Sequence, residues 1–123
     1  MIIDERMAVF IDSLDKGNSS LLNTIEKEAL EAQVPIIRRP TQSLLKFLLA
    51  LIRPARILEV GTAVGFSALL MSEYGVENCR ITTIEKQKDR ILAARENFRR
   101  AGREGRITLL EGDAGEVLKE LEG

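Results

Sequence analysis

A chain of 123 residues is long enough to bury one hydrophobic core, so a single domain spanning residues 1–123 is expected. Eighteen basic and 19 acidic residues give a formal net charge of −1, which excludes a global field that would draw the protein to nucleic acid or an anionic membrane. The single cysteine, Cys79, excludes an internal disulfide, and the early acids Asp4 and Glu5 are unlike a secretory signal. We therefore expect a cytoplasmic protein with no membrane role.

The first third of the sequence predicts three amphipathic helices, because apolar residues recur at spacings of three and four. The third helix should begin at Thr41, which can cap it, after a loop over residues 34–40 that contains Pro35. The three helices would form a cap, residues 1–54, ahead of an α/β unit at 55–123. Their apolar positions are Ile3, Met7, Phe10, Ile11 and Leu14, then Leu21, Leu22, Ile25, Ala29 and Ala32, then Leu44, Leu45, Phe47, Leu48 and Leu51.

The remainder of the sequence alternates strands with helices, which predicts an α/β fold. Because crossovers between parallel strands are right-handed, the three strands should lie in the order 3-2-1 with their carboxyl ends on one edge. Residues that follow the strands would then meet in one crevice. We expect strands at 56–60, 79–85 and 106–111, and helices at 66–73, 86–101 and 114–121.

The turn after the first strand is the most informative feature of the sequence. Gly61 and Gly65 lack a Cβ, so the chain can turn sharply there and bring backbone N–H groups against a ligand. The helix that follows adds the positive end of its dipole. This arrangement predicts a site for a nucleotide-like ligand.

Acidic residues follow the other two strands. Glu85 stands 20 positions after the second glycine (65 to 85), the spacing typical of an acid that binds both hydroxyls of a ribose. Its alternative role is a solvated acid at the start of a helix. Asp113 could accept a hydrogen bond from a purine amino group while Ala114 leaves room for the ring, or Asp113 could simply cap the last helix.

Four short blocks of the sequence occur in an order and spacing typical of one family. They are ILEVGTAVGFSAL at 57–69, ITTIE at 81–85, EGDA at 111–114 and the weaker VPII at 34–37. These blocks resemble the class I S-adenosylmethionine-dependent O-methyltransferases, specifically the catechol and caffeoyl-CoA O-methyltransferase-like family. The resemblance covers most of the chain and implies the amino-terminal, cofactor-binding half of a Rossmann-like methyltransferase fold. S-adenosylmethionine would be the cofactor and S-adenosylhomocysteine the product.

The resemblance also implies a role for nine residues at or beside the expected crevice. The segment Arg38-Arg39-Pro40-Thr41 departs from the family, whose members usually have an acid and a glycine there. By resemblance, Glu59, Gly61 and Ser67 would hold the amino-acid portion of the cofactor, Glu85 the ribose, and Asp113 with Ala114 the adenine, while Thr62 and Ala63 line the turn and Ile37 lies in the loop that closes over the methionine end.

The resemblance places the family's metal ligands and general base from a fourth strand onward, where this sequence has no residues. A divalent metal is known in the family, but no metal site and no catalytic residue is assigned here. We expect a truncated chain that supplies the cofactor-binding half of the enzyme. The methyl acceptor would be a small hydroxylated molecule or, as for some relatives, tRNA.

A sheet that ends at the first strand would expose an apolar edge there. Ile57, Leu58 and Val60 would lack a neighbouring strand, which favours association of two chains. We therefore expect a homodimer or a larger assembly that forms through this edge.

Two other functions remain as alternatives. A nicotinamide-dependent dehydrogenase fragment would also need a glycine turn and a later acid, but the third glycine of its usual motif is missing between Gly61 and Gly65. A nucleic-acid-binding module would use the basic residues of 86–106, but Asp89, Glu96 and Glu104 interrupt them. That pattern is more typical of the solvated face of a helix.

Overall fold

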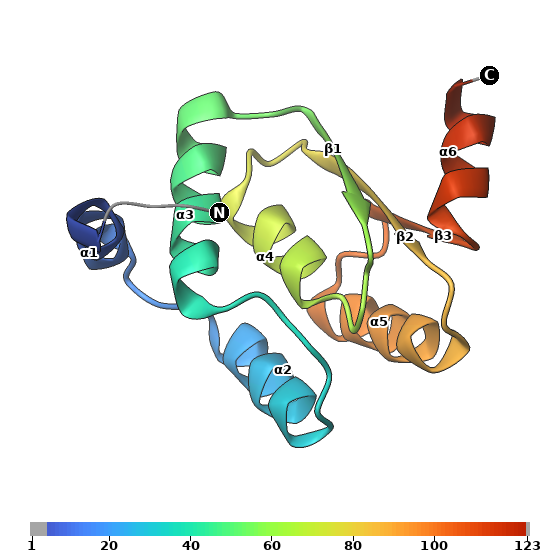
Figure 1. Cartoon of the computed structure of the whole chain (residues 1–123), viewed down its shortest axis with the longest axis horizontal. Coiled ribbons are helices and arrows are strands. Elements are labelled where there is room, and N and C mark those ends of the chain that lie inside the picture. Colours follow the sequence, from blue (N-terminus) through green and yellow to red (C-terminus); the bar gives the residue numbers. More distant parts are fainter. Residues whose placement is uncertain (1–4, 123) are drawn as a thin grey trace.

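A parallel sheet of three strands forms the centre of the structure, a computed structural model that describes residues 5–122 (Figure 1). The strands β1 (Arg56–Val60), β2 (Arg80–Glu85) and β3 (Ile107–Glu111) lie in the order β1-β2-β3. Val60 pairs with Ile84 across the first pair of strands, and Glu85 pairs with Glu111 across the second. The parallel order 3-2-1 predicted from the sequence is confirmed.

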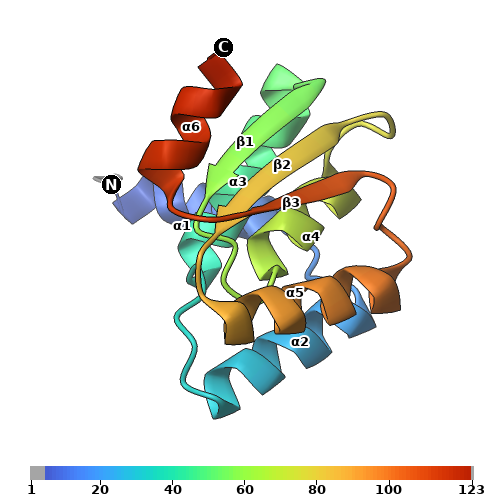
Figure 2. The same ribbon diagram turned by 90° about the vertical axis from the view of Figure 1, so that its right-hand side faces the viewer.

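Two crossover helices cover one face of the sheet. They are α4 (Phe66–Tyr74) and α5 (Lys88–Ala101), whereas α6 (Ala114–Glu122) lies apart from both, where the strands end (Figure 2). Six of the nine residues of α4 are buried, because this helix is surrounded by the sheet and by neighbouring helices. Glycine ends α5: Gly102, at φ +66°, donates its N–H to two carbonyls of the last turn.

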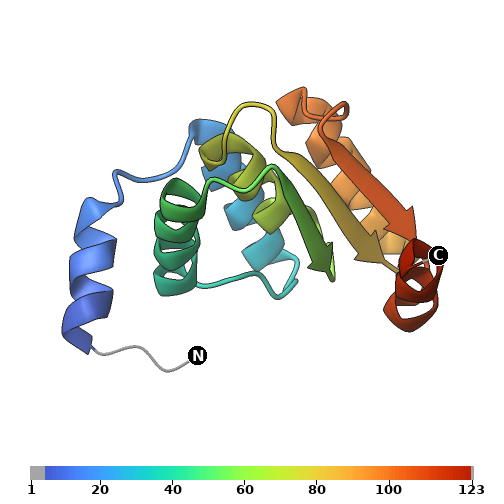
Figure 3. The ribbon, with the colours of Figure 1, turned by 90° about the horizontal axis from the view of Figure 1, so that it is seen from above.

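The helices at the start of the chain form a further layer beyond α4 (Figure 3). Both α2 (Ser20–Glu31) and α3 (Arg39–Ile52) contact α4, and α1 (Glu5–Leu14) packs on α3. Only Ile11 of the predicted apolar stripe of α1 is buried, since Met7, Phe10 and Leu14 are more than half exposed. The predicted stripe also included Ile3, which lies outside the described residues.

The predicted start of the third helix was wrong. The helix begins at Arg39, with Arg38 at its N-cap and Pro40 in its first turn, so Thr41 is not the cap. Proline suits this position, because the first N–H groups of a helix have no partner within the helix and the fixed φ of proline is already helical. The loop expected over 34–40 is therefore shorter.

The hydrophobic core lies between the sheet and the α2, α4 and α5 helices. Its largest buried side chains include Leu22 and Ile25 of α2, Phe66 and Leu70 of α4, and Ile81 of β2. The other face of the sheet is partly open at its β1 edge, where Leu58 and Val60 are 52% and 58% exposed. Within residues 5–122, no helix is both long and apolar enough to cross a membrane.

Candidate functional site

The turn between β1 and α4 has an unusual backbone, because three of its residues have left-handed conformations. Their φ angles are +90° at Gly61, +50° at Ala63 and +88° at Gly65. The turn is tied to β2, since Ile84 accepts backbone hydrogen bonds from Gly61 at 2.9 Å and from Thr62 at 3.2 Å. A strand-to-helix turn of this shape brings the backbone close to whatever occupies the crevice.

Helix α5 supports the turn from behind. The buried Asn97 donates its amide to the carbonyl of Val64 at 2.8 Å. The ring of Phe98 lies against Gly65 so closely that a Cβ added there would be 2.6 Å from ring atom Cε1. The second glycine therefore serves both the backbone conformation and the close packing of α4 on α5.

Glu85, at the end of β2, is 93% buried and its carboxylate faces the turn. Its Oε1 accepts the N–H of Ala63 at 2.9 Å, which stabilises the left-handed conformation of that alanine. Its Oε2 accepts the N–H groups of Lys86 at 3.2 Å and Gln87 at 3.1 Å. The solvated acid considered as the alternative is excluded by this burial.

Glu59, near the end of β1, lies at the centre of a small polar cluster. Its Oε2 accepts the hydroxyl of Ser67, from the first turn of α4, and its Oε1 accepts the hydroxyl of Thr83 at 2.7 Å. Burial raises the pKa of the Glu59 carboxyl, while the hydroxyls of Ser67 and Thr83 oppose that rise. A cation placed beside this carboxylate would relieve the cost of its burial.

Two cavities meet at Gly61. The first, of about 210 Å³, lies between the turn and the loop that precedes α3, and it is lined by Pro35, Ile36, Ile37, Gly61, Thr62, Ala63, Phe66 and Ser67. The second, of about 240 Å³, lies across the ends of the strands and is lined by Val60, Gly61, Ile84, Glu85, Lys86, Gly112, Asp113 and Ala114. Eight of the nine residues singled out from the sequence line one or both cavities, and the ninth, Glu59, is hydrogen-bonded to Ser67.

The loop that carries Ile37 is held in place from inside the protein. Gln42, which is fully buried in α3, donates its amide both to the carbonyl of Ile37 at 2.9 Å and to Glu26 at 2.8 Å. Asn18 donates to the oxygen of the same amide at 3.1 Å. The wall of the first cavity is thus anchored to α2 and α3.

Asp113 is an exposed residue immediately before α6. Its carboxylate accepts the N–H of Glu116 at 3.3 Å, so the capping role considered from the sequence is confirmed. The N–H of Gly112 donates to the carbonyl of Glu85 at 2.9 Å, which brings the residues after β3 beside the end of β2. A capping carboxylate at the rim of a cavity remains accessible to a ligand.

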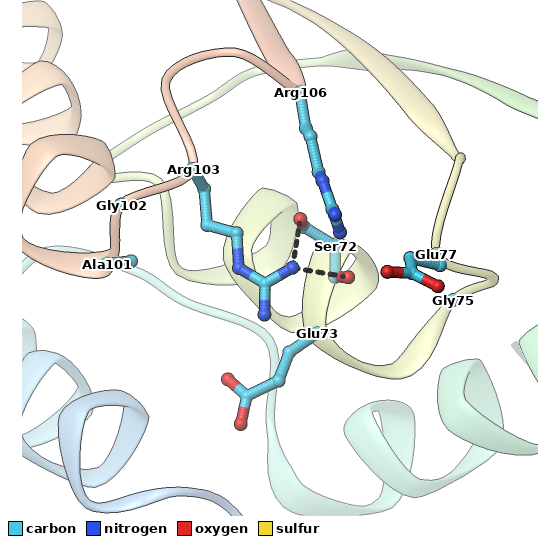
Figure 4. A pocket seen from close by; sticks show the side chains of 8 residues that line it. All are labelled: Ser72, Glu73, Gly75, Glu77, Ala101, Gly102, Arg103 and Arg106. Carbon is cyan, nitrogen blue, oxygen red and sulfur yellow. Dashed lines mark hydrogen bonds between the residues drawn. The ribbon is translucent and has the colours of Figure 1, made fainter.

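A larger polar cavity, of about 570 Å³, lies at the opposite end of the strands, near the residues that precede β2 and β3. Arg103 donates there to the carbonyl and the hydroxyl of Ser72, both at 3.4 Å, and Glu73 and Glu77 lie at its margin (Figure 4). None of the nine residues lines it. Ligands of open α/β sheets bind at the carboxyl ends of the strands, so the crevice at Gly61 is the candidate functional site.

The part of the chain that the structure describes holds no cluster of three histidine, cysteine, aspartate or glutamate side chains that could bind a metal ion. The cysteine is buried immediately before β2, and burial raises the pKa of the Cys79 thiol. Such a thiol is a packing group rather than a nucleophile.

Comparison with known proteins assigns the chain to a family. The family model for O-methyltransferases matches residues 12–123. The chain belongs to the O-methyltransferase family. A catechol O-methyltransferase from Mycobacterium tuberculosis is 31% identical over 116 residues, which are 93% of this chain and 53% of that protein.

Solved structures of this O-methyltransferase family share the fold of the chain. A Staphylococcus aureus protein provisionally assigned as a caffeoyl-CoA O-methyltransferase superposes with a TM-score of 0.82 at 30% identity, over 96% of this chain and 56% of that one. The S-adenosylhomocysteine-bound methyltransferase PaMTH1 from Podospora anserina superposes with a TM-score of 0.79 at 30% identity, over 100% of this chain and 56% of that one. The fold is therefore Rossmann-like, as predicted, and the chain spans about half the length of these relatives.

Sequence reasoning missed the side chains that hold the candidate site together. Thr62 was singled out only as a lining residue, and Thr83, Asn97 and Gln42 were not singled out at all. A partial signal for Thr83 was present, because alternation along a strand places it on the same face as Glu85. Asn97 and Gln42 sit within amphipathic helices, and nothing in the spacing of either distinguishes it from a solvated amide.

Proposed function

We propose that this chain supplies the S-adenosylmethionine-binding part of an O-methyltransferase. One observation carries the proposal: the two cavities that meet at Gly61 are lined by residues at or just after the ends of all three strands and by residues of the loop before α3. Membership of the family and the S-adenosylhomocysteine-bound relative support it.

The chemistry of the first cavity fits the amino-acid portion of the cofactor. Its ammonium group needs an anionic partner, and the carboxylate of Glu59, beside the Ser67 hydroxyl, would supply one. Each carboxylate oxygen of Glu59 accepts one hydrogen bond from a protein hydroxyl, which leaves further lone pairs for a ligand. Ile37, in the loop across the cavity, would cover the methionine end of the cofactor.

The chemistry of the second cavity fits a nucleoside. Glu85 Oε1 accepts one N–H, so it keeps a lone pair for a ribose hydroxyl. Asp113 would accept a hydrogen bond from the adenine amino group, and Ala114 would border the ring, as the resemblance implies. When bound, S-adenosylmethionine supplies a sulfonium methyl group that an acceptor oxygen can take.

The proposed acceptor is a small molecule with a hydroxyl group. This class is supported by the names of the relatives, which include a catechol O-methyltransferase and an assigned caffeoyl-CoA O-methyltransferase. Nucleic acid is a weaker candidate, because three arginines of α5 are paired with acids: Arg95 with Glu111, Arg99 with Glu96, and Arg100 with Glu28.

Thermal unfolding in the presence of nucleotides tests the proposal. A ligand that binds only the folded chain raises the midpoint temperature of unfolding. S-adenosylhomocysteine should therefore raise this temperature, and NAD should not. The opposite result, stabilisation by NAD alone, would replace the proposal with a dehydrogenase-like site. Strong binding of tRNA that weakens steeply with salt would instead favour a nucleic-acid acceptor.

We also propose that two copies of the chain associate through the β1 edge, where Leu58 and Val60 are largely exposed. β1 pairs with β2 on one side and ends the described sheet on the other, and edge strands with exposed apolar side chains favour pairing. A cytoplasmic location completes the proposal, since a buried thiol at Cys79 suits a reducing compartment.

A further inference from the structure

Two buried threonine hydroxyls lie behind the carboxylate of Glu59. Thr83 is completely buried and Thr62 is 1% exposed. Their hydroxyl oxygens are 2.6 Å apart, and that of Thr83 is 2.7 Å from Glu59 Oε1. The register of the sheet sets this contact, because Glu59 of β1 is the direct partner of Thr83 in β2.

The direction of the hydrogen bonds follows from counting protons. A hydroxyl has one hydrogen, and an ionised carboxylate can only accept. If Thr83 donates to Glu59, the bond between the threonines must be donated by Thr62. With Glu59 ionised, the chain of bonds therefore runs from Thr62 through Thr83 to Glu59.

We propose that Thr83, supported by Thr62, is a positioning residue that keeps the Glu59 carboxylate ionised and aimed at the amino group of the cofactor. The inference rests on the proposed function. Thr62 also belongs to the glycine turn, where its N–H and carbonyl bond to Ile84 and Gly65. The hydrogen bonds from Thr62 through Thr83 to Glu59, here called the threonine relay, therefore couple the carboxylate to the turn that shapes both cavities.

The other polar groups near Glu59 have their own partners. Ser67, from α4, holds the second carboxylate oxygen of Glu59. Glu85, two residues along β2 from Thr83 on the same face of the sheet, is the neighbouring acid, and three backbone N–H groups bind its carboxylate. Removing the Thr83 hydroxyl would thus leave Glu59 Oε1 without its protein donor.

The first test needs no ligand. Carbon NMR of the side-chain carboxyl groups would follow the titration of Glu59 in wild type, Thr83→Val, Thr83→Ser and Thr82→Val. The near-isosteric valine removes the donor and should raise the Glu59 pKa further. Serine keeps a hydroxyl donor, so Thr83→Ser should return the Glu59 pKa to its wild-type value. Thr82, the adjacent threonine on the other face, is the matched control and should leave it unchanged. An unchanged Glu59 pKa in Thr83→Val would overturn the inference.

The second test uses two ligands in calorimetry at neutral pH. Thr83→Val should weaken the binding of S-adenosylhomocysteine about tenfold. It should leave the affinity for 5′-methylthioadenosine, which lacks the amino-acid portion, unchanged. Equal weakening of both ligands would show a merely structural role and overturn the inference. If folded wild type bound neither ligand, the proposed function would fail, and the NMR titration would still decide whether Thr83 controls Glu59.

Discussion

Glu59 carries a carboxylate that folding removes from water, and this makes stability depend on pH. Burial raises its pKa above the ordinary 4.5, so the folded state binds the proton more tightly than the unfolded state. The stability that this proton contributes is complete below the unfolded pKa and is lost as pH rises through the folded pKa. Wild type should therefore lose stability relative to Glu59→Gln as pH rises.

Urea unfolding of both proteins at a series of pH values from about pH 4 to pH 8 measures this difference. Glutamine keeps the shape of the side chain but does not titrate. The pH dependence of the difference in unfolding free energy therefore reports proton binding by Glu59. A difference in unfolding free energy that stays constant across the range would contradict the raised pKa.

Gly65 should tolerate no side chain. Alanine there would have to adopt φ +88° and would place its Cβ 2.6 Å from the buried ring of Phe98. We expect Gly65→Ala to lower the free energy of unfolding, measured in urea, by about 3 kcal/mol. Gly105→Ala is the control, because a Cβ there meets nothing within 4 Å. Equal stability of the two variants would show that the turn adapts.

At the residue scale, the site was predictable to the extent that it depends on strand ends. Parallel strands bring their carboxyl ends to one edge, which is why Gly61, Glu85 and Asp113 were expected to converge and do. The threonine relay was not predictable, because it depends on the register that places Thr83 beside Glu59. A shift of one residue would have sent its hydroxyl to the other face.

A buried ion pair links α3 to the residue that follows α1. Lys46 of α3 donates to Asp15, just after α1, at 2.6 Å, and the two side chains are 10% and 6% exposed. Burial acts to raise the pKa of Asp15, but hydrogen bonds from Lys46, Gly17 and Ser43 outweigh it and the net pKa is lowered. The carboxylate is therefore ionised at neutral pH.

Removing Lys46 should leave a buried charge without its main partner. We expect Lys46→Met to lose about 3 kcal/mol of unfolding free energy at neutral pH. Arg99→Met is the control, because its pair with Glu96 is exposed on α5 and should change stability little. A similar effect of both substitutions in urea unfolding would contradict a structural role for the α1 to α3 pair.

At the element scale, the type of each helix and strand could be predicted, but some boundaries could not. The third helix begins two residues earlier than expected, since proline in the first turn starts it as well as a capping threonine would. The exposure of most of the α1 stripe was also unpredictable, because periodicity gives a face but not its partner.

At the scale of the whole molecule, the β1 edge should control association. We expect the chain to dimerise at micromolar concentration and Val60→Lys to be monomeric, because lysine on an exposed strand opposes pairing. Leu92→Lys is the control, since Leu92 is similarly exposed but lies on α5. Sedimentation velocity distinguishes the species, and a monomeric wild type at high concentration would contradict the proposed interface.

The central claim is that the crevice at Gly61 binds the cofactor, and calorimetric titration with S-adenosylhomocysteine tests it most directly. We expect wild type to bind and Glu85→Ala to bind at least about tenfold more weakly, since a carboxylate that accepts a ribose hydroxyl contributes about 1.5–3 kcal/mol. Glu111→Ala, at the paired position of β3, is the matched control and should bind like wild type. Absence of binding by a folded wild-type chain, or equal loss in both variants, would contradict the claim.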